Sequence, residues 1–311
     1  MDSRKENLIS FRTQDGFQLD ALLLLRELDN KADTLNTPII IHVHGVLGHF
    51  LARGTPRLLP PALLEHGINS FSVNTRMAFM GQIMGQGVFN DAINDIDASV
   101  ELLVKEGFSQ IFILGYSLGA NIAAYYAANR SDHNVRGLIL EGCAFSLPDS
   151  QRKRWGRWNS VPSYDEVSSK AKEILGSDPH KSLNDQILIV YRAWGPTFNP
   201  FHIEIFSYKT WWFMRGPEAY NAMTYKLIPK VAVPILFLQG DNDDIIESRE
   251  TEELAHLARA ARNSDITVEY IPRAKHDCME NPDETVKVIV SWLSSINLKS
   301  SCRDQIPFQT K

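Results

Sequence analysis

The alternation of uninterrupted apolar runs with amphipathic helical patterns is the feature that most constrains the fold of this chain. The runs are rich in Ile, Leu and Val and lack the polar–apolar alternation of a half-exposed strand, which indicates strands buried on both faces. We predict strands at 38–45, 68–76, 111–115, 135–142, 233–241 and 266–272, and helices at 58–67, 89–107, 118–129, 248–262 and 282–296. Strands and helices in this order form a doubly wound, mostly parallel α/β sheet.

Two stretches depart from this alternation. Near the N-terminus, two apolar runs flank the turn residues Gln14, Asp15 and Gly16, which predicts an antiparallel hairpin. Between residues 144 and 230 the alternation lapses, and we interpret this stretch as an insertion that divides a core domain into residues 1–143 and 231–311. The insertion holds five of the six tryptophans, namely Trp155, Trp158, Trp194, Trp211 and Trp212.

Composition and charge exclude several classes of protein. At 311 residues, 44% of them hydrophobic, the chain is long enough to bury a substantial core, and its net charge of -5 offers no attraction for nucleic acid or an acidic membrane. The N-terminus lacks the pattern of a secretory signal, and the apolar runs are too short for insertion into a membrane. Three cysteines without CxxC spacing argue against a disulfide framework, so we expect a reducing, cytoplasmic location.

A serine between two glycines stands where a predicted strand turns into a predicted helix. The segment Ile111–Tyr126 reads IFILGYSLGANIAAYY, with Ser117 at the centre of Gly-Tyr-Ser-Leu-Gly. Gly115 and Gly119 permit a sharp turn, and the following helix directs its N-terminal amides toward an oxyanion formed there. The serine could simply belong to a turn, but this context favours a nucleophile.

A serine hydroxyl is a poor nucleophile unless a base removes its proton, so the hypothesis requires a histidine and a carboxylate that orients it. Two places fit, each directly after a late strand, where the C-terminal ends of parallel strands gather functional groups. One is Gly240-Asp241-Asn242-Asp243-Asp244, and the other is Ala274-Lys275-His276.

These motifs resemble those of the alpha/beta-hydrolase superfamily, and the resemblance extends over residues 8–296 apart from the insertion. In relatives the acid is commonly the third residue after the glycine that ends its strand. The resemblance therefore implies a catalytic triad of Ser117, Asp243 and His276, and it implies no metal and no cofactor.

The resemblance also bears on the neighbouring positions. Asp241 and Asp244 are the fallback acids, although Asp241 is more readily interpreted as a turn or helix-capping carboxylate. Lys275 stands where many relatives carry glycine. Similarity to the family places the two oxyanion donors at the backbone N–H groups of Val46 and Leu118.

The histidines of the segment IHVHGVLGHF allow a second interpretation. His42 and His44 would lie on one face of a strand, with His49 nearby, and such a pattern can bind a metal ion. No carboxylate follows at ligand spacing, so we favour a structural, hydrogen-bonding role for His44.

An insertion at this position of the superfamily usually forms a cap that roofs the active site, and residues 144–230 fit that position as a helical cap. Its aromatic residues would line an apolar pocket, so we expect an uncharged, moderately hydrophobic ester as substrate. The cations Arg152, Lys153, Arg154 and Arg157 could receive an acidic substrate group or nucleic acid, but a solvent-exposed helix face is the favoured interpretation.

The function that follows is a serine hydrolase of carboxylesterase type that cleaves a small-molecule ester through an acyl-enzyme. The same triad can cleave thioesters, amides or carbon–carbon bonds, because the fold alone does not choose among them. A ligand-binding receptor and a scaffold protein of this fold are the alternatives from other classes. The sequence does not determine whether the chain forms a homo-oligomer.

Overall fold

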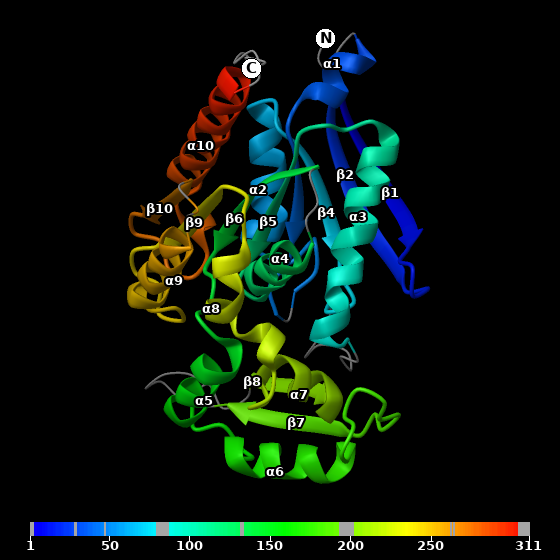
Figure 1. Ribbon diagram of the computed structural model, residues 1–311, viewed down its shortest axis with the longest axis vertical. Coiled ribbons are helices and arrows are strands. Elements are labelled where there is room, and N and C mark those ends of the chain that lie inside the picture. The colour runs from blue at the N-terminus through cyan, green and yellow to red at the C-terminus, as the bar shows by residue number, and fades with distance from the viewer. Residues whose placement is uncertain are drawn as a thin grey trace, which may run out of the picture.

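An eight-stranded, mostly parallel sheet carries the core of the molecule (Figure 1). The computed structural model describes residues 3–27, 30–46, 48–78, 87–130, 134–192, 202–261, 263 and 265–303. The strand order is β1-β2-β4-β3-β5-β6-β9-β10, in which β1 pairs with β2 and β2 with β4 antiparallel, and the other pairings are parallel. The strands are β1 (Ser3–Arg12), β2 (Gln18–Glu27), β3 (Ile39–Val43), β4 (Asn69–Asn74), β5 (Ile111–Tyr116), β6 (Val135–Glu141), β9 (Ile235–Gly240) and β10 (Ile266–Ile271).

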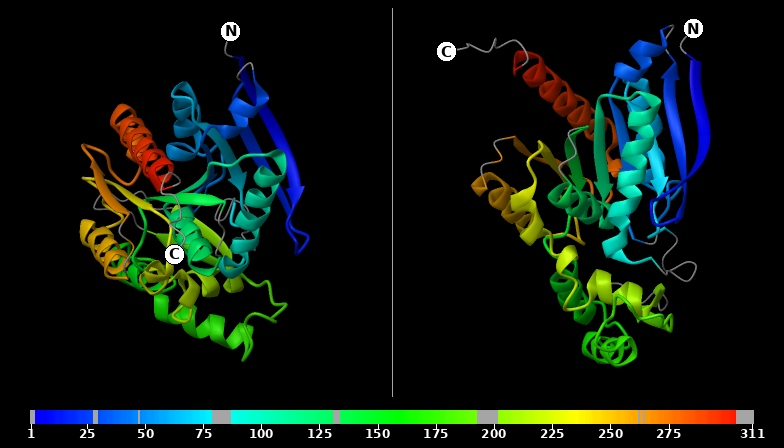
Figure 2. Two further views of the ribbon diagram at one scale, coloured as in Figure 1. Left: turned by 45° about the horizontal axis from the view of Figure 1, so that its top comes forward. Right: turned by 45° about the vertical axis from the view of Figure 1, so that its right-hand side comes forward.

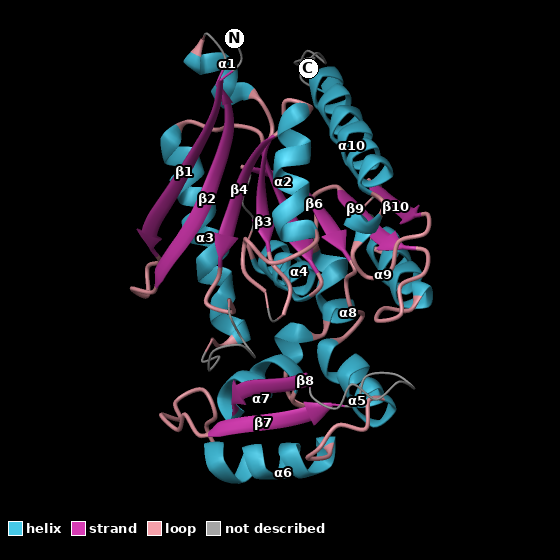
Figure 3. Cartoon of the chain, turned by 180° about the vertical axis from the view of Figure 1, so that it is seen from behind, coloured by secondary structure: helices cyan, strands magenta, loops and turns pink. Residues whose placement is uncertain are grey.

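Helices cover both faces of this sheet (Figure 2 and Figure 3). Each face has its own hydrophobic core. On one face lie α2 (Thr55–Glu65) and α10 (Pro282–Arg303), and on the other lie α3 (Ala92–Glu106), α4 (Leu118–Asn129) and α9 (Ser248–Ala260). The doubly wound α/β fold predicted from the sequence is therefore confirmed. Within the described residues, no helix combines the length and the apolar content needed to cross a membrane.

The burial of side chains explains why these segments form these elements. All five residues of β3 are buried, as expected for a strand covered on both faces. In α3 the buried positions Ile93, Ile96, Val100 and Leu103 follow the spacing of one helical face. On the opposite face of the sheet, the ring of Trp292 packs edge-on against Phe112, which fixes α10 to β5.

The predicted N-terminal hairpin is confirmed, because β1 and β2 pair in antiparallel register around the turn. Two differences from the predicted helices have simple causes. The helix α2 begins at Thr55 rather than 58, because Pro56 occupies its first turn, where a proline costs no hydrogen bond. A short helix α1 (Lys31–Asn36) lies in a polar stretch where no helix is predicted, and the side chain of Asn30 caps it.

The insertion between β6 and β9 contains a small sheet in addition to helices (Figure 3). Its elements are α5 (Leu147–Arg157), α6 (Tyr164–Leu175), β7 (Ile187–Arg192), β8 (His202–Ser207), α7 (Tyr208–Arg215) and α8 (Thr224–Leu227), and β7 pairs antiparallel with β8. Strict alternation of exposed and buried residues makes Ile187–Arg192 a strand. The domain limits at residues 143/144 and 230/231 stay a prediction.

Several aromatic residues of the insertion pack together in its interior, as part of the hydrophobic cluster on one face of the main sheet. The rings of Trp155, Tyr164 and Trp211 lie within about 6 Å of one another in edge-on or tilted contacts. Trp212 is also buried, whereas Trp194 lies outside the described residues. Cys143 and Cys278 are both buried and free.

Candidate active site

The candidate site lies where the order of strands reverses. From β3 the chain moves outward to β4 and then returns to place β5 on the other side of β3, so the loops after β3 and β5 diverge. Val43 and Gly115 pair in the sheet, so the two loops start at the same level. A crevice at the C-terminal ends of such strands is the usual place for a ligand in an open α/β sheet.

Ser117 occupies a strained turn between β5 and α4. Its backbone has φ 53° and ψ −117°, a conformation that non-glycine residues rarely adopt and that recurs at functional sites. The N–H of Ser117 donates a hydrogen bond of 2.8 Å to the carbonyl oxygen of Glu141, which ties the turn to β6. A Cβ at Gly119 would lie 2.2 Å from the carbonyl oxygen of Val43, so only glycine allows α4 to pass β3 this closely.

Ser117, His276 and Asp243 form a continuous chain of hydrogen bonds. The Oγ of Ser117 lies 2.9 Å from Nε2 of His276, and the Nδ1 of His276 lies 2.9 Å from Oδ2 of Asp243. Because the carboxylate can only accept, Nδ1 carries the proton and donates it, which leaves Nε2 free to accept from the serine hydroxyl. The three residues come from the ends of β5, β10 and β9, in the arrangement that activates a serine.

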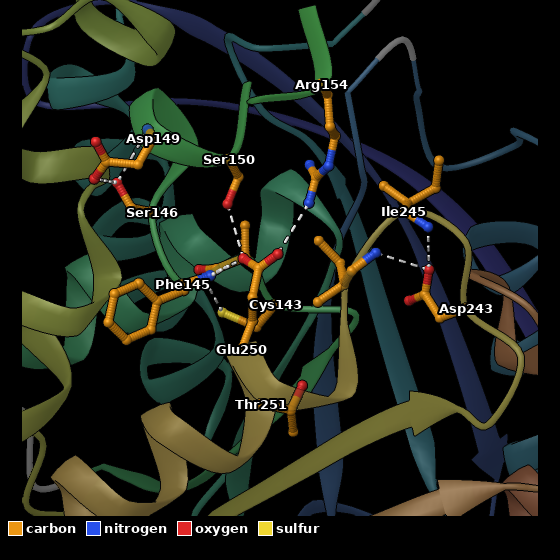
Figure 4. Close-up of polar contacts among 12 residues, drawn as sticks. Cys143, Phe145, Ser146, Asp149, Ser150, Arg154, Asp243, Ile245, Glu250 and Thr251 are labelled. Carbon is orange, nitrogen blue, oxygen red and sulfur yellow. Dashed lines mark hydrogen bonds and ion pairs between the residues drawn. The ribbon is translucent and has the colours of Figure 1, made fainter. Parts of the chain in front are cut away.

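Backbone groups orient the carboxylate of Asp243. Its Oδ1 accepts hydrogen bonds from the N–H groups of Ile245 and Ile246, at 2.8 and 2.9 Å, and the side chain is 1% exposed (Figure 4). Asp241 and Asp244, the two alternative candidates for the acid, have different surroundings. Asp241 accepts from the N–H of Arg273 at 2.7 Å, as expected of a turn residue, and Asp244 is exposed.

Gly142, which the sequence motifs do not indicate, makes room for the imidazole of His276. This residue directly follows β6 with φ +58°, and a Cβ there would lie 2.8 Å from Cε1 of His276. The ring of Tyr116 contacts the same imidazole, with centroids 5.4 Å apart. The position of His276 thus depends on a glycine that is more than a hundred residues away in the sequence, which no local motif indicates.

The two backbone donors expected from the family lie at the same cavity as Ser117. Leu118 is the first residue of α4, so its N–H has no acceptor within the helix. Val46 lies in the loop that follows β3, beside the polar contacts of the His44 side chain. The Nδ1 of His44 lies 2.9 Å from the carbonyl oxygen of Gly45, and its Nε2 lies 3.0 Å from Oγ1 of Thr75.

His42 and His44 are both neutral, structural side chains in this environment. Burial lowers the pKa of His42 to about 3 and that of His44 to about 4, because the charged imidazolium loses its hydration. The Nε2 of His42 lies 3.0 Å from Oγ of Ser70. Among the residues that the structure describes, no three His, Cys, Asp or Glu side chains gather as metal ligands. These contacts favour the hydrogen-bonding interpretation of His44.

A cavity of about 210 Å³ joins this site to the insertion. Its walls include Ser117, His276, Val46 and Leu118 from the core. The insertion contributes apolar side chains and, unexpectedly, charged ones. The lining residues from the insertion are Ala144, Leu147, Gln151, Arg154, Trp158, Arg192, Glu204, Met214 and Arg215.

The charged part of this lining corrects one interpretation and adds three residues. The sequence favours a solvent-exposed face for Arg154, but this side chain is 6% exposed and lines the cavity, whereas Arg152 and Arg157 are exposed as expected. Arg192, Glu204 and Arg215 are cavity residues that no sequence motif indicates. The only indication for Arg192 is its position in β7, where buried residues alternate with exposed ones and Arg192 falls on a buried position.

The fold and the site place the chain in a known family. The chain matches the model of the alpha/beta hydrolase family over residues 40–288 and therefore belongs to that family. Its fold is that of esterases and lipases. The esterase Pf2001 of Pyrococcus furiosus superposes with a TM-score of 0.62 at 14% identity, over 94% of this chain and 93% of that one. A monoacylglycerol lipase of Paleococcus ferrophilus gives 0.56 at 21% identity, over 84% and 97%.

A similarity in sequence is also found. A protein of Haemophilus influenzae described as a probable lysophospholipase L2 is 26% identical over 217 residues, which span 61% of this chain and 59% of that protein. The matches to curated proteins therefore span less than two thirds of the length of those proteins.

Proposed function

We propose that the protein is a serine hydrolase that cleaves carboxylic esters, with Ser117 as nucleophile, His276 as general base and acid, and Asp243 as the residue that orients the histidine. The observation that carries this proposal is the chain of two 2.9 Å hydrogen bonds from Ser117 through His276 to Asp243. It opens onto a cavity whose lining includes Val46 and Leu118, the residues whose N–H groups are expected to bind an oxyanion.

The first half of the reaction acylates the serine. The Oγ of Ser117 attacks the carbonyl carbon of the ester as its proton moves to Nε2 of His276, and the carbonyl oxygen becomes an oxyanion. The N–H groups of Leu118 and Val46 donate to that oxyanion, and Asp243 stabilises the imidazolium. The imidazolium then protonates the alcohol oxygen, the carbon–oxygen bond of the ester breaks, and the alcohol leaves.

The second half releases the acid. Water attacks the acyl-enzyme as His276 takes its proton, and a second oxyanion forms at the same donors. The bond between the acyl carbon and Oγ of Ser117 breaks, the serine regains its proton from the imidazolium, and the carboxylic acid leaves. The apolar walls of Leu147, Trp158 and Met214 favour a small to medium organic substrate.

Release of p-nitrophenol from esters of graded acyl length tests this proposal. We expect Ser117→Ala to lower kcat by about three to six orders of magnitude, because the chain loses its nucleophile. Ser109→Ala is the matched control, since Ser109 is exposed just before the start of β5 and its hydroxyl donates a hydrogen bond to Asn36 at the surface. Turnover that survives Ser117→Ala would assign the activity to another group. Ligand binding without any turnover would instead favour a receptor.

A further inference from the structure

Three buried arginines of the insertion line the same cavity as Ser117. They are Arg154 of α5, Arg192 of β7 and Arg215 of α7, with exposed fractions of 6%, 4% and 2%. A buried guanidinium is costly unless other groups pair with it and fill its hydrogen-bond donors. The partners of these three side chains therefore indicate whether the site is complete without a ligand.

The carboxylate of Glu204 serves two of the arginines through a single oxygen. Its Oε2 accepts a hydrogen bond of 2.7 Å from Nη1 of Arg215. The same oxygen lies 2.6 Å from Nη2 of Arg192, at an ion-pair distance, but that contact lacks the alignment of a hydrogen bond. Glu204 is 3% exposed, so its carboxylate is shielded from solvent.

The third arginine belongs to a separate cluster. Glu250 of α9 accepts from Nη2 of Arg154 at 3.3 Å, and its other oxygen accepts from Ser150 and from the N–H of Phe145, at 2.8 and 2.9 Å (Figure 4). This carboxylate is therefore occupied and ties α5 to the core. Asp243, the other nearby acid, has both oxygens engaged by the hydrogen bonds of the candidate site.

Arg192 is the side chain that stays incomplete. Neither its Nε nor its Nη2 makes a hydrogen bond among the described residues, although the side chain is buried. Its guanidinium carbon lies 4.4 Å from the ring centroid of Trp158, so the ring covers one face and leaves the donors at the edge. Burial lowers the pKa of Arg192 to about 9, which still leaves it charged at neutral pH.

We propose that Arg192, in the setting of this arginine cluster, binds an anionic group of the substrate. The protein then acts on a small ester that carries a carboxylate or a phosphate away from the scissile bond. A planar guanidinium fork fits both anions, and either would fill Nε, which has no partner among the described residues, and share Nη2 with Glu204. The inference rests on the proposed esterase function, and it departs from the uncharged substrate expected from the sequence.

Two matched substrate pairs distinguish where the anion lies. The first compares p-nitrophenyl hydrogen adipate with p-nitrophenyl 6-methylheptanoate, in which an isopropyl group replaces the carboxylate. The second compares butanoylglycerol 3-phosphate with butanoylglycerol, by the release of butanoate. We expect kcat/KM to favour the anionic member of one pair by about tenfold to a hundredfold, as for one hydrogen-bonded charge. A preference for the anionic member of the adipate pair would place the anion on the acyl part of the substrate. A preference for the anionic member of the phosphate pair would place it on the alcohol part.

Variants of Arg192 then test the residue itself. In Arg192→Met the preference should fall to near one, because kcat/KM for the anionic ester should fall more than kcat/KM for the neutral ester, and Arg192→Lys should restore part of the preference. Arg152→Met is the control on α5, where Arg152 is 64% exposed and pairs with Asp165 at the surface. Equal or better turnover of the neutral member in both pairs by the unchanged protein would overturn the inference, even if Arg192→Met does not fold.

A binding measurement separates this inference from the esterase proposal. Calorimetry with Ser117→Ala measures binding of adipate and of glycerol 3-phosphate without turnover. Anion binding that Arg192→Met abolishes, in a protein that hydrolyses no ester, would defeat the esterase proposal and leave the anion site standing. Serine-dependent ester hydrolysis with no binding of either anion would do the reverse.

Discussion

The candidate site in the core and the arginine cluster in the insertion are both buried, yet different kinds of group hold them in place. In the core, main-chain geometry fixes the functional atoms, through the strained turn of Ser117 and the two N–H groups that hold Asp243. In the insertion, side chains hold one another, as Glu204 and Trp158 do with Arg192.

This difference teaches which part of the molecule is complete by itself. In the core, His276 has both ring nitrogens engaged and Asp243 has both oxygens engaged, so the proposed catalytic residues are already held together without a substrate. In the insertion, Arg192 keeps unfilled donors among the described residues. We infer a division of roles, in which the core carries the reaction and the insertion selects the substrate.

The largest effect that would sharpen the comparison comes from Asp243→Asn. The amide can keep its oxygen on the N–H groups of Ile245 and Ile246, which turns its NH₂ toward His276. The imidazole must then accept at Nδ1 and carry its proton on Nε2, facing Ser117, so it no longer acts as a base. We expect kcat on p-nitrophenyl esters to fall about 10⁴-fold. Asp244→Asn, at an exposed side chain, should have no such effect, and the opposite result would transfer the role of the acid.

The next largest effect concerns two buried carboxylates, Glu141 in the core and Glu204 in the insertion. Glu204 has two arginines. Among the described residues, Glu141 pairs with no cation, and its carboxylate accepts hydrogen bonds from Thr55 and from the N–H of Cys278, at 2.6 and 3.1 Å. Burial, with Asp277 nearby, raises the pKa of Glu141 from 4.5 to about 8. The folded protein therefore binds this proton more tightly than the unfolded chain does.

The sign of the pH dependence follows from this raised pKa. The stability that Glu141 contributes is fully present below about pH 4.5 and is lost as the pH rises toward 8. We expect the free energy of unfolding of the unchanged protein, minus that of Glu141→Gln, to fall by up to about 1.4 kcal/mol per pH unit in this window. Urea unfolding between pH 5 and 8 measures it, and parallel curves for the two proteins would show that Glu141 does not titrate there.

The same contrast explains how much the sequence could predict. Features that depend on main-chain conformation have recognisable local sequence patterns. The alternation of strands and helices therefore points to the fold, and the Gly-Tyr-Ser-Leu-Gly turn points to Ser117. Chain order then points to His276 and to the acids after β9, because parallel strands end at one edge of the sheet. The fold is confirmed, and the structure brings Ser117, His276 and Asp243 within hydrogen-bond distance, while their catalytic roles stay predictions.

The rest depends on contacts between distant segments. Arg192, Glu204 and Arg215 come from three elements of the insertion, and nothing in the spacing of the sequence shows that they converge. Arg154 sits among exposed cations in the sequence, and only the packing of α5 against Glu250 buries it. A side chain that depends on tertiary pairing has no local pattern by which to recognise it.

A pair of glycine variants separates strain from site geometry, with a smaller effect than the loss of the acid. Gly142 and Gly176 both have positive φ, at 58° and 72°, so alanine should cost each about 1 kcal/mol or more of stability. Only at Gly142 would the new Cβ meet His276, since nothing lies within 4 Å of that position at Gly176. We expect kcat/KM to fall about 10²-fold for Gly142→Ala alone. Equal activity losses would instead assign the effect to backbone strain.

The smallest effect concerns the carboxylate that ties the insertion to the core. In Glu250→Gln the amide oxygen can keep Ser150 and Phe145, but its NH₂ then faces Arg154, which loses its acceptor. We expect the free energy of unfolding to fall by about 1–3 kcal/mol in urea, because a hydrogen bond to a charged group is lost from a mostly buried place. The control Glu253→Gln lies on the same helix, where Glu253 pairs with Arg249 at the surface, and should change stability by less than about 0.5 kcal/mol.

The Glu250→Gln variant also bears on the inferred division of roles between the core and the insertion. Because Glu250 contacts α5 and not the hydrogen-bond chain of Ser117, turnover of a small neutral ester should change little in Glu250→Gln even as stability falls. Its preference for an anionic ester should weaken, since a released Arg154 shifts the lining that surrounds Arg192. A loss of neutral-ester turnover as large as that caused by Gly142→Ala would mean that the core site relies on the insertion for its geometry, and the division of roles would fail.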